Sequence, residues 1–87
     1  MSESKIKLFS GSSHPALAGA IAKILKLPLA PIELKKFACG EIYAKPLETV
    51  RDFDVYVIQT GTQNTNEDLM ELFIMLDAFK RSFAAKI

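Results

Sequence analysis

The feature that most constrains the fold is a strong β-strand pattern that leads through a polar loop into a long helix. Residues 55–58 have the sequence Val-Tyr-Val-Ile, a nearly continuous run of strand-forming side chains. Such a run is typical of a central parallel strand that is buried on both faces. Residues 59–66 are all polar or Gly and predict a loop, and a helix is expected over residues 67–82, with acidic side chains in its first turn and basic ones in its last. This succession favours an α/β fold.

A first strand and helix are expected near the N-terminus. A short apolar run is formed by Ile6, Leu8 and Phe9, and the polar segment 10–14 interrupts it before Pro15, which suits the first turn of a helix. Ser13 is placed to cap this helix. One apolar helix face is expected from the spacing of Leu17, Ala20, Ile21, Ile24 and Leu25. Two prolines further along the chain end this element.

The middle of the chain predicts a short β excursion. Residues 32–37 alternate as in a half-buried strand, Gly40 marks a turn, and residues 42–44 form a second short strand. Residues 47–52 are expected to form a loop or one helical turn. The predicted class is therefore α/β, with a mainly parallel sheet of about three strands and a short hairpin.

Composition argues against several classes of protein. Eleven basic residues against ten acidic ones give a net charge of +1, which offers no electrostatic reason to bind nucleic acid or an acidic membrane surface. Cys39 is the only cysteine, so no disulfide can form within the chain, and a reducing, cytoplasmic location is expected. No stretch approaches 18 apolar residues, so no membrane helix is expected. Residues 72–76 are apolar on all sides, which favours burial against a partner subunit or a further part of the same fold.

The polar residues offer no complete catalytic arrangement, and no catalytic residue is assigned. His14 is the only histidine and has no Cys, Asp or Glu at ligand spacing, so it is expected to be structural and no metal site is predicted. Residues 10–13 could hold an anion on their backbone N–H groups, but no P-loop lysine follows and a helix cap is favoured. The acidic residues within 66–71 are explained by the helix dipole better than by a metal ion.

Several segments, in order along the chain, resemble the start of ribose-phosphate pyrophosphokinases. Residues 6–14 resemble the family's opening strand and turn, residues 33–37 with 40–43 its nucleotide-binding hairpin, residues 48–51 its regulatory loop, and residues 68–78 its long helix. The resemblance covers nearly the whole chain in register. It implies a phosphoribosyltransferase-like three-layer domain, of which residues 1–87 would be an incomplete N-terminal part.

The resemblance also implies an activity. The family transfers the β,γ-diphosphoryl group of ATP to the C1 hydroxyl of ribose 5-phosphate, giving phosphoribosyl pyrophosphate and AMP, with Mg²⁺ as cofactor. Its members have two domains of this kind, assemble as dimers and hexamers, and are several times longer than 87 residues. The chain is therefore expected to belong to a homo-oligomeric enzyme, to be inactive alone, and to leave most Mg²⁺ ligands to segments beyond Ile87.

The same resemblance implies an ATP site in the predicted hairpin. Phe37 would stack on the adenine ring, Gly40 would let the backbone come close, and Glu41 would accept hydrogen bonds from the nucleotide. Cys39 stands where the family usually has an acidic or amide residue, and a thiol is a poor substitute for a carboxylate acceptor. From the residues alone, Phe37 as a core side chain and Cys39 as a small buried filler remain open alternatives.

A second site is implied at Thr49 and Arg51, which match positions of the family's regulatory phosphate or ADP site. Arginine suits forked contacts with phosphate. A solvated loop arginine is the open alternative. Phe83 stands near the end of the long helix, where the family often has a small polar residue tied to the same site.

Two other functions compete with an enzyme segment. A non-catalytic nucleotide-binding or regulatory subunit would keep the hairpin and the apolar helix and would associate with a full-length synthetase; Cys39 mildly favours it. A free-standing α/β module of unrelated function is disfavoured by the matched segments.

Overall fold

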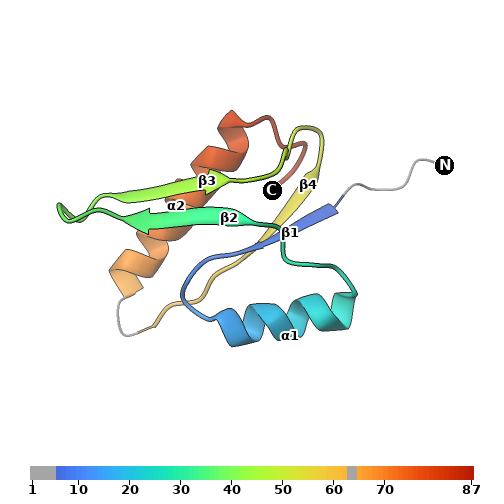
Figure 1. The fold of residues 1–87 in the computed structure, drawn as a ribbon, viewed down its shortest axis with the longest axis horizontal. Helices are drawn as coiled ribbons and strands as arrows, with labels where there is room; N and C mark the ends of the chain where they lie inside the picture. Colours follow the sequence, from blue (N-terminus) through green and yellow to red (C-terminus); the bar gives the residue numbers. More distant parts are fainter. Residues whose placement is uncertain (1–5, 63–64) are drawn as a thin grey trace.

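The computed structural model describes residues 6–62 and 65–87, and its elements follow the predicted order (Figure 1). They are β1 (Ile6–Ser10), α1 (Pro15–Leu25), β2 (Ile32–Lys36), β3 (Ile42–Pro46), β4 (Asp54–Ile58) and α2 (Thr65–Arg81). The mixed α/β class, with a parallel sheet and an antiparallel hairpin, is confirmed. Within the described ranges, no helix is long and apolar enough to cross a membrane.

The strands form two separate two-stranded sheets. β1 pairs in parallel with β4, with Leu8 opposite Tyr56, whereas β2 pairs antiparallel with β3, with Leu34 opposite Ala44. The predicted sheet of about three parallel strands therefore contains only two full strands, and residues 32–36 belong to the hairpin. The turn between β2 and β3 is only a few residues long, and a parallel crossover needs a dozen or more.

Single-residue bridges widen the parallel sheet at both edges. Leu29 pairs in parallel with Leu8, and Lys86 pairs in parallel with Asp54. The N–H of Val55 donates to the carbonyl of Lys86 over 2.7 Å. The chain thus occupies a parallel position on each side of the β1–β4 pair, although neither position extends to a full strand.

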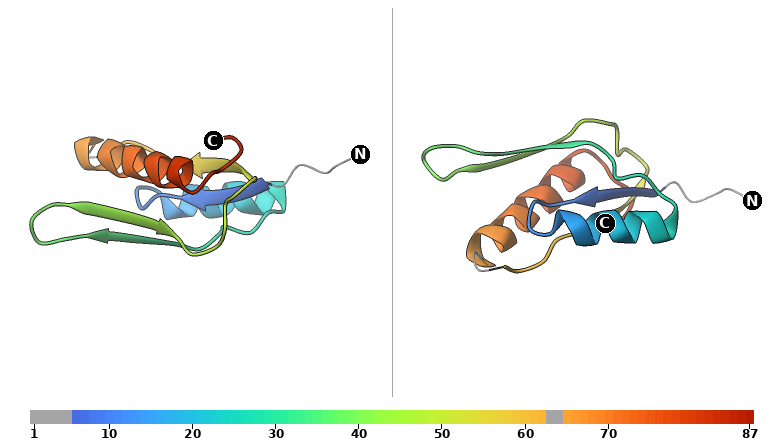
Figure 2. Two further views of the ribbon diagram at one scale, coloured as in Figure 1. Left: turned by 90° about the horizontal axis from the view of Figure 1, so that it is seen from above. Right: turned by 60° about the horizontal axis from the view of Figure 1, so that its bottom comes forward.

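The hydrophobic core lies between one face of the parallel sheet, α2 and the hairpin (Figure 2). Its buried side chains are Phe9, Val50, Val55, Met75 and Phe79. The rings of Phe9 and Phe79 are tilted by 39° with their centroids 4.7 Å apart, a favourable aromatic contact. Half-buried hairpin side chains pack against this cluster; they are Ile32, Leu34 and Ala44. One small core therefore connects all three layers.

Helix α1 runs along β1 on the side away from the hairpin (Figure 2). Its buried residues are Ala18 and Ala22, whereas Ile24 is 78% exposed. The predicted apolar face is wrong: Leu17, Ala20, Ile24 and Leu25 are exposed and Ile21 is half-buried. Small side chains let a helix backbone approach a strand closely, so side-chain size decides which face packs.

Strand β4 is buried on one face only. Val55 is buried, but Tyr56 is 57% exposed, so the predicted burial on both faces is wrong. β1 is the strand buried on both faces, through Leu8 and Phe9. Within the described part of the chain, α1 covers β1 but not Tyr56, and an apolar hollow of about 290 Å³ remains between them.

A hydrogen-bonded network joins the loops at the carboxyl ends of β1 and β4. The side-chain oxygen of Gln59 accepts from the N–H of Ser13 (3.2 Å) and from its hydroxyl (2.6 Å). Its amide nitrogen donates to the carbonyl of Asp68 (3.0 Å) and to the carboxylate of Glu71 (2.9 Å). Glu71 also accepts from the N–H of Ser12 over 2.7 Å. The N–H groups of Ser12 and Ser13, considered for anion binding, are thus engaged by side chains, and that of Gly11 donates to the carbonyl of Ile58.

The cap of α1 is His14 rather than the predicted Ser13. The His14 Nδ1 accepts from the N–H of Leu17 over 2.9 Å, and Pro15 is the first helical residue, as predicted. The Ser13 hydroxyl instead donates to Gln59. The expectation that His14 is structural is confirmed.

We expect Gly11→Ala to destabilise the fold by about 1–3 kcal/mol, the usual cost of overpacking. A Cβ at this position would lie 2.2 Å from the side-chain oxygen of Gln59, which cannot move without losing its hydrogen bonds. The matched control is Gly19→Ala in α1, where a Cβ would meet nothing within 4 Å; it should stabilise by about 0.5–1 kcal/mol. Urea unfolding followed by circular dichroism measures both, and equal effects would contradict the role of the Gln59 contact.

Candidate functional site

The tip of the β2–β3 hairpin brings the four predicted ATP-binding residues into one turn. The N–H of Phe37 donates to the carbonyl of Glu41 over 2.7 Å, and the N–H of Gly40 donates to the carbonyl of Phe37 over 2.8 Å. Ala38 and Cys39 lie between these closing residues. The turn stands at one end of the elongated molecule, as Figures 1 and 2 show.

Gly40 has a conformational reason to be glycine. Its φ is +89°, in the region that other residues rarely adopt, and it follows two turn residues in a three-residue hairpin loop. A Cβ there would meet nothing within 4 Å, so backbone strain rather than crowding favours glycine. The same lack of crowding leaves the backbone of the tip open to a ligand.

The side chains at the tip face solvent. Phe37 is 47% exposed, and its ring centroid lies 6.3 Å from that of Tyr43 on the opposite strand, with the rings tilted by 54°. Phe37 is therefore not a core residue. Cys39 is exposed, so it is not a buried filler, and Glu41 is exposed as well. This edge can offer an aromatic face, a carboxylate and a thiol to a ligand.

A polar cavity of about 210 Å³ lies between the hairpin and the first half of α2. Its lining residues are Ser12, Leu34, Lys35, Lys36, Ile42, Glu67, Asp68 and Glu71. Glu67 pairs with Lys36, and Asp68 accepts from the N–H of Thr62 over 2.8 Å. Together with the Glu71 contacts, these pairs give each α2 carboxylate a protein partner. Across residues 6–62 and 65–87, no group of three or more His, Cys, Asp or Glu is placed to hold a metal ion.

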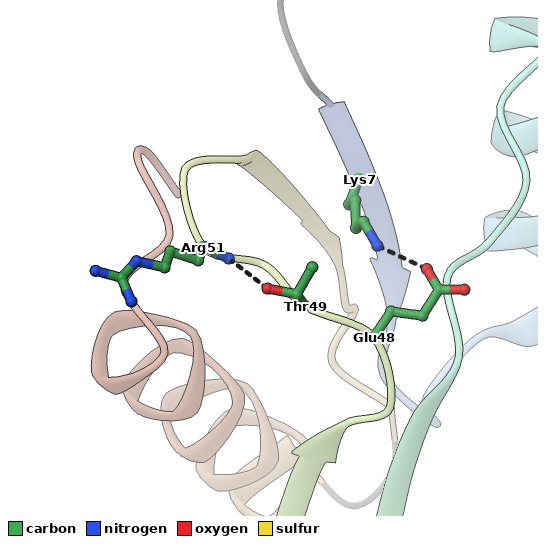
Figure 3. Close-up of polar contacts among 4 residues, drawn as sticks. All are labelled: Lys7, Glu48, Thr49 and Arg51. Atoms are coloured by element: carbon green, nitrogen blue, oxygen red, sulfur yellow. Dashed lines mark hydrogen bonds and ion pairs between the residues drawn. The ribbon is translucent and has the colours of Figure 1, made fainter.

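The predicted regulatory residues lie in the loop between β3 and β4 (Figure 3). The hydroxyl oxygen of Thr49 accepts from the N–H of Arg51 over 3.3 Å, which leaves its proton available for donation. Both side chains are exposed. Figure 3 shows the Arg51 guanidinium extending toward the end of α2, away from Glu48 and Lys7. The loop lies at the opposite end of the hairpin from the turn at Gly40 (Figure 1).

Contacts on both sides hold this loop in place. Val50 is buried in the core. Glu48 forms an ion pair of 2.7 Å with Lys7, whose side chain is only 14% exposed and whose Nζ lies 4.7 Å from the ring centroid of Phe53. The N–H of Asp52 donates to the carbonyl of Phe83 over 3.1 Å. Thr49 and Arg51 are therefore presented from a fixed backbone.

The match to known proteins covers nearly all of these elements. Residues 6–87 match a family model that describes the N-terminal domain of ribose phosphate pyrophosphokinase. The chain belongs to this family. A ribose-phosphate pyrophosphokinase of Clostridium perfringens is 50% identical over 82 residues, which are 94% of this chain and 26% of that protein. The chloroplastic ribose-phosphate pyrophosphokinase 1 of Arabidopsis thaliana is 49% identical over 83 residues, which are 95% of this chain and 21% of that protein.

A solved structure shows the same fold. The crystal structure of the phosphoribosylpyrophosphate synthetase from Mycobacterium smegmatis superposes with a TM-score of 0.90 at 40% identity. The superposition covers 92% of this chain and 27% of that one. The chain thus spans about a quarter of the length of the pyrophosphokinases that it matches.

Sequence reasoning missed several residues that shape these sites. Tyr43 lies beside Phe37 because β3 runs antiparallel to β2. The register of the β2–β3 pair is the signal that could have identified this neighbour. The pair Lys7–Glu48 joins residues 41 positions apart, and no local pattern signals it. Phe83 was placed near the regulatory loop only by resemblance; the structure brings its ring to 5.4 Å from the Arg51 guanidinium carbon.

Proposed function

We propose that this chain is part of a ribose-phosphate diphosphokinase, which transfers diphosphate from ATP to ribose 5-phosphate and yields phosphoribosyl pyrophosphate and AMP. The observation that carries the proposal is the family match over residues 6–87, together with relatives such as a pyrophosphokinase that is 50% identical. The hairpin tip supports it, because an exposed aromatic ring beside a flexible glycine and a carboxylate suits a purine nucleotide.

In this proposal, the hairpin tip is one edge of the ATP site. Phe37 stacks on adenine, Glu41 accepts hydrogen bonds from the nucleotide, and Gly40 lets the backbone approach. Cys39 lies against the base or ribose. The tip is convex and exposed, so another surface has to close the site, which agrees with assembly as a homo-oligomer. These residues alone are then inactive.

Mg²⁺ enters this proposal with ATP. The carboxylates in the first half of α2 each have a protein partner, so they do not form a ready-made metal cage. Mg²⁺ usually keeps several waters and binds substrate phosphates with only one or two carboxylates. ATP oxygens and residues outside these 87 would therefore supply most of its ligands, and the ion would neutralise the charge that develops on the transferred diphosphate.

The loop at Thr49 and Arg51 is proposed as the regulatory site for phosphate or ADP. An exposed guanidinium suits an oxyanion, and the exposed Thr49 hydroxyl of the same loop can also donate a hydrogen bond. The fixed backbone of the loop reduces the ordering cost of binding.

The second candidate is a non-catalytic nucleotide-binding or regulatory subunit of a full-length synthetase. The exposed thiol of Cys39, at a position where the family usually has an acidic or amide residue, favours it. Assay of the complete gene product for AMP formation from ATP and ribose 5-phosphate, alone and with a full-length synthetase, separates the two functions. Activity of the product alone supports the enzyme, whereas inactivity with co-purification supports the subunit.

The Phe37→Ala variant should weaken ATP binding by about 1–3 kcal/mol, the typical contribution of one base stacked on an aromatic side chain. Isothermal titration calorimetry with Mg-ATP on the complete gene product measures this loss. Phe73→Ala is the matched control, because Phe73 is also exposed but lies on α2 away from the tip. Equal ATP affinity in the Phe37 variant and the parent would rule out the stacking role.

Cys39→Asp should strengthen ATP or ADP binding, because a carboxylate accepts hydrogen bonds from an amino group or ribose hydroxyl far better than a thiol does. The gain expected from one hydrogen bond to a charged group is about 1.5–3 kcal/mol. Cys39→Ser is the control for loss of the thiol itself. Unchanged or weaker affinity of the Asp variant in calorimetry would count against the hairpin as a working nucleotide site.

A further inference from the structure

The two arginines of the chain are in different environments. Arg81 pairs with Asp77 on the next turn of α2, with 2.9 Å between Nε and Oδ2. Arg51 has no carboxylate within ion-pair distance among residues 6–62 and 65–87. Its guanidinium carbon instead lies 5.4 Å from the centroid of the Phe83 ring. A contact through the ring face leaves the guanidinium N–H donors available to an anion.

Phe83 has a backbone conformation that is unusual for a residue with a bulky side chain. It is the second residue past the end of α2, with a φ of +64°, where glycine is strongly preferred. The N–H of Phe83 donates to the carbonyl of Lys80, and that of Ala84 donates to the carbonyl of Phe79, both over 3.2 Å. A bulky residue in this conformation is a strained outlier, and such strain is found at functional positions.

The Phe83 ring contributes nothing to the core, because it is 67% exposed. Its contact with Arg51 is nevertheless held by the backbone on both sides. Arg51 forms an antiparallel bridge with Ala84, and the N–H of Asp52 donates to the carbonyl of Phe83. Hydrogen bonds therefore join the two backbone segments that carry the ring and the guanidinium, and this keeps the two groups in contact.

We propose that Phe83 is a positioning residue for a phosphate site at Arg51. The contact with its ring restricts the guanidinium to one orientation near the end of α2, so that the Arg51 donors are already placed to meet a phosphate group. This inference rests on the proposed regulatory site, and it adds the residue that restricts the side chain of Arg51. An arginine loses several rotatable bonds when it binds an anion, and a ring that already restricts them lowers that cost.

The test measures the affinity of the complete gene product for inorganic phosphate by isothermal titration calorimetry. Phe83→Leu keeps an apolar side chain on the same strained backbone but removes the ring, and it should weaken phosphate binding roughly two- to five-fold. Phe83→Tyr restores a ring face and should recover the parent affinity. Phe73→Leu, at an exposed phenylalanine in the middle of α2, should leave the affinity unchanged.

Arg51→Ala separates failure of this inference from failure of the site. Loss of phosphate binding in Arg51→Ala, together with weaker binding in Phe83→Leu and recovery in Phe83→Tyr, supports the proposal. If Arg51→Ala loses phosphate but Phe83→Leu binds it as well as or better than the parent, the positioning role is overturned and the site stands. If the parent binds no phosphate, or Arg51→Ala binds it unchanged, the regulatory site itself is overturned.

Discussion

The contact between Phe9 and Phe79 connects the parallel sheet of this small fold with helix α2. Phe9 comes from β1 of the parallel sheet, and Phe79 comes from the last turn of α2. Both rings are fully buried, with centroids 4.7 Å apart. The loop before β4 inserts Val50 into the same cluster, and the hairpin rests on it through its half-buried residues. The positions of both candidate sites therefore depend on one small core.

The hairpin is anchored at its base and free at its tip. Side chains near its base, such as Ile32 and Ala44, touch the core, whereas Phe37 and the turn that follows extend beyond the rest of the molecule (Figures 1 and 2). A free convex tip can supply one side of a ligand site but cannot enclose a ligand. The loop that carries Thr49 and Arg51 differs, because Val50 and two segments of backbone fix it.

Much of the fold could be predicted because its patterns are local. The strand at 55–58, the turn at Gly40 and the helix start at Pro15 each follow from a few neighbouring residues, and each is confirmed. The buried face of α1 could not be predicted, because packing there follows the small size of Ala18 and Ala22 rather than hydrophobic spacing. The exposure of Tyr56 depends on which elements cover the sheet, and sequence periodicity carries no information about that.

The candidate sites show the same division. Resemblance supplied the residues, and the structure places Phe37, Cys39, Gly40 and Glu41 in one exposed turn and Thr49 with Arg51 in one fixed loop. The ring that contacts Arg51 is that of Phe83, and its position depends on the path of the backbone after α2. Phe83 reaches Arg51 only because a left-handed residue reverses the backbone there. Sequence spacing does not encode such a reversal when the residue is not glycine.

The central claim is that the hairpin tip binds ATP. Hydrogen–deuterium exchange of the complete gene product, with and without Mg-ATP, tests it most directly. The account predicts that nucleotide slows exchange in peptides that span residues 36–43, because the bound base orders the exposed turn. If nucleotide leaves these peptides unchanged and protects only those that contain Ser12 or Glu71, the hairpin is not the nucleotide site and the account is contradicted.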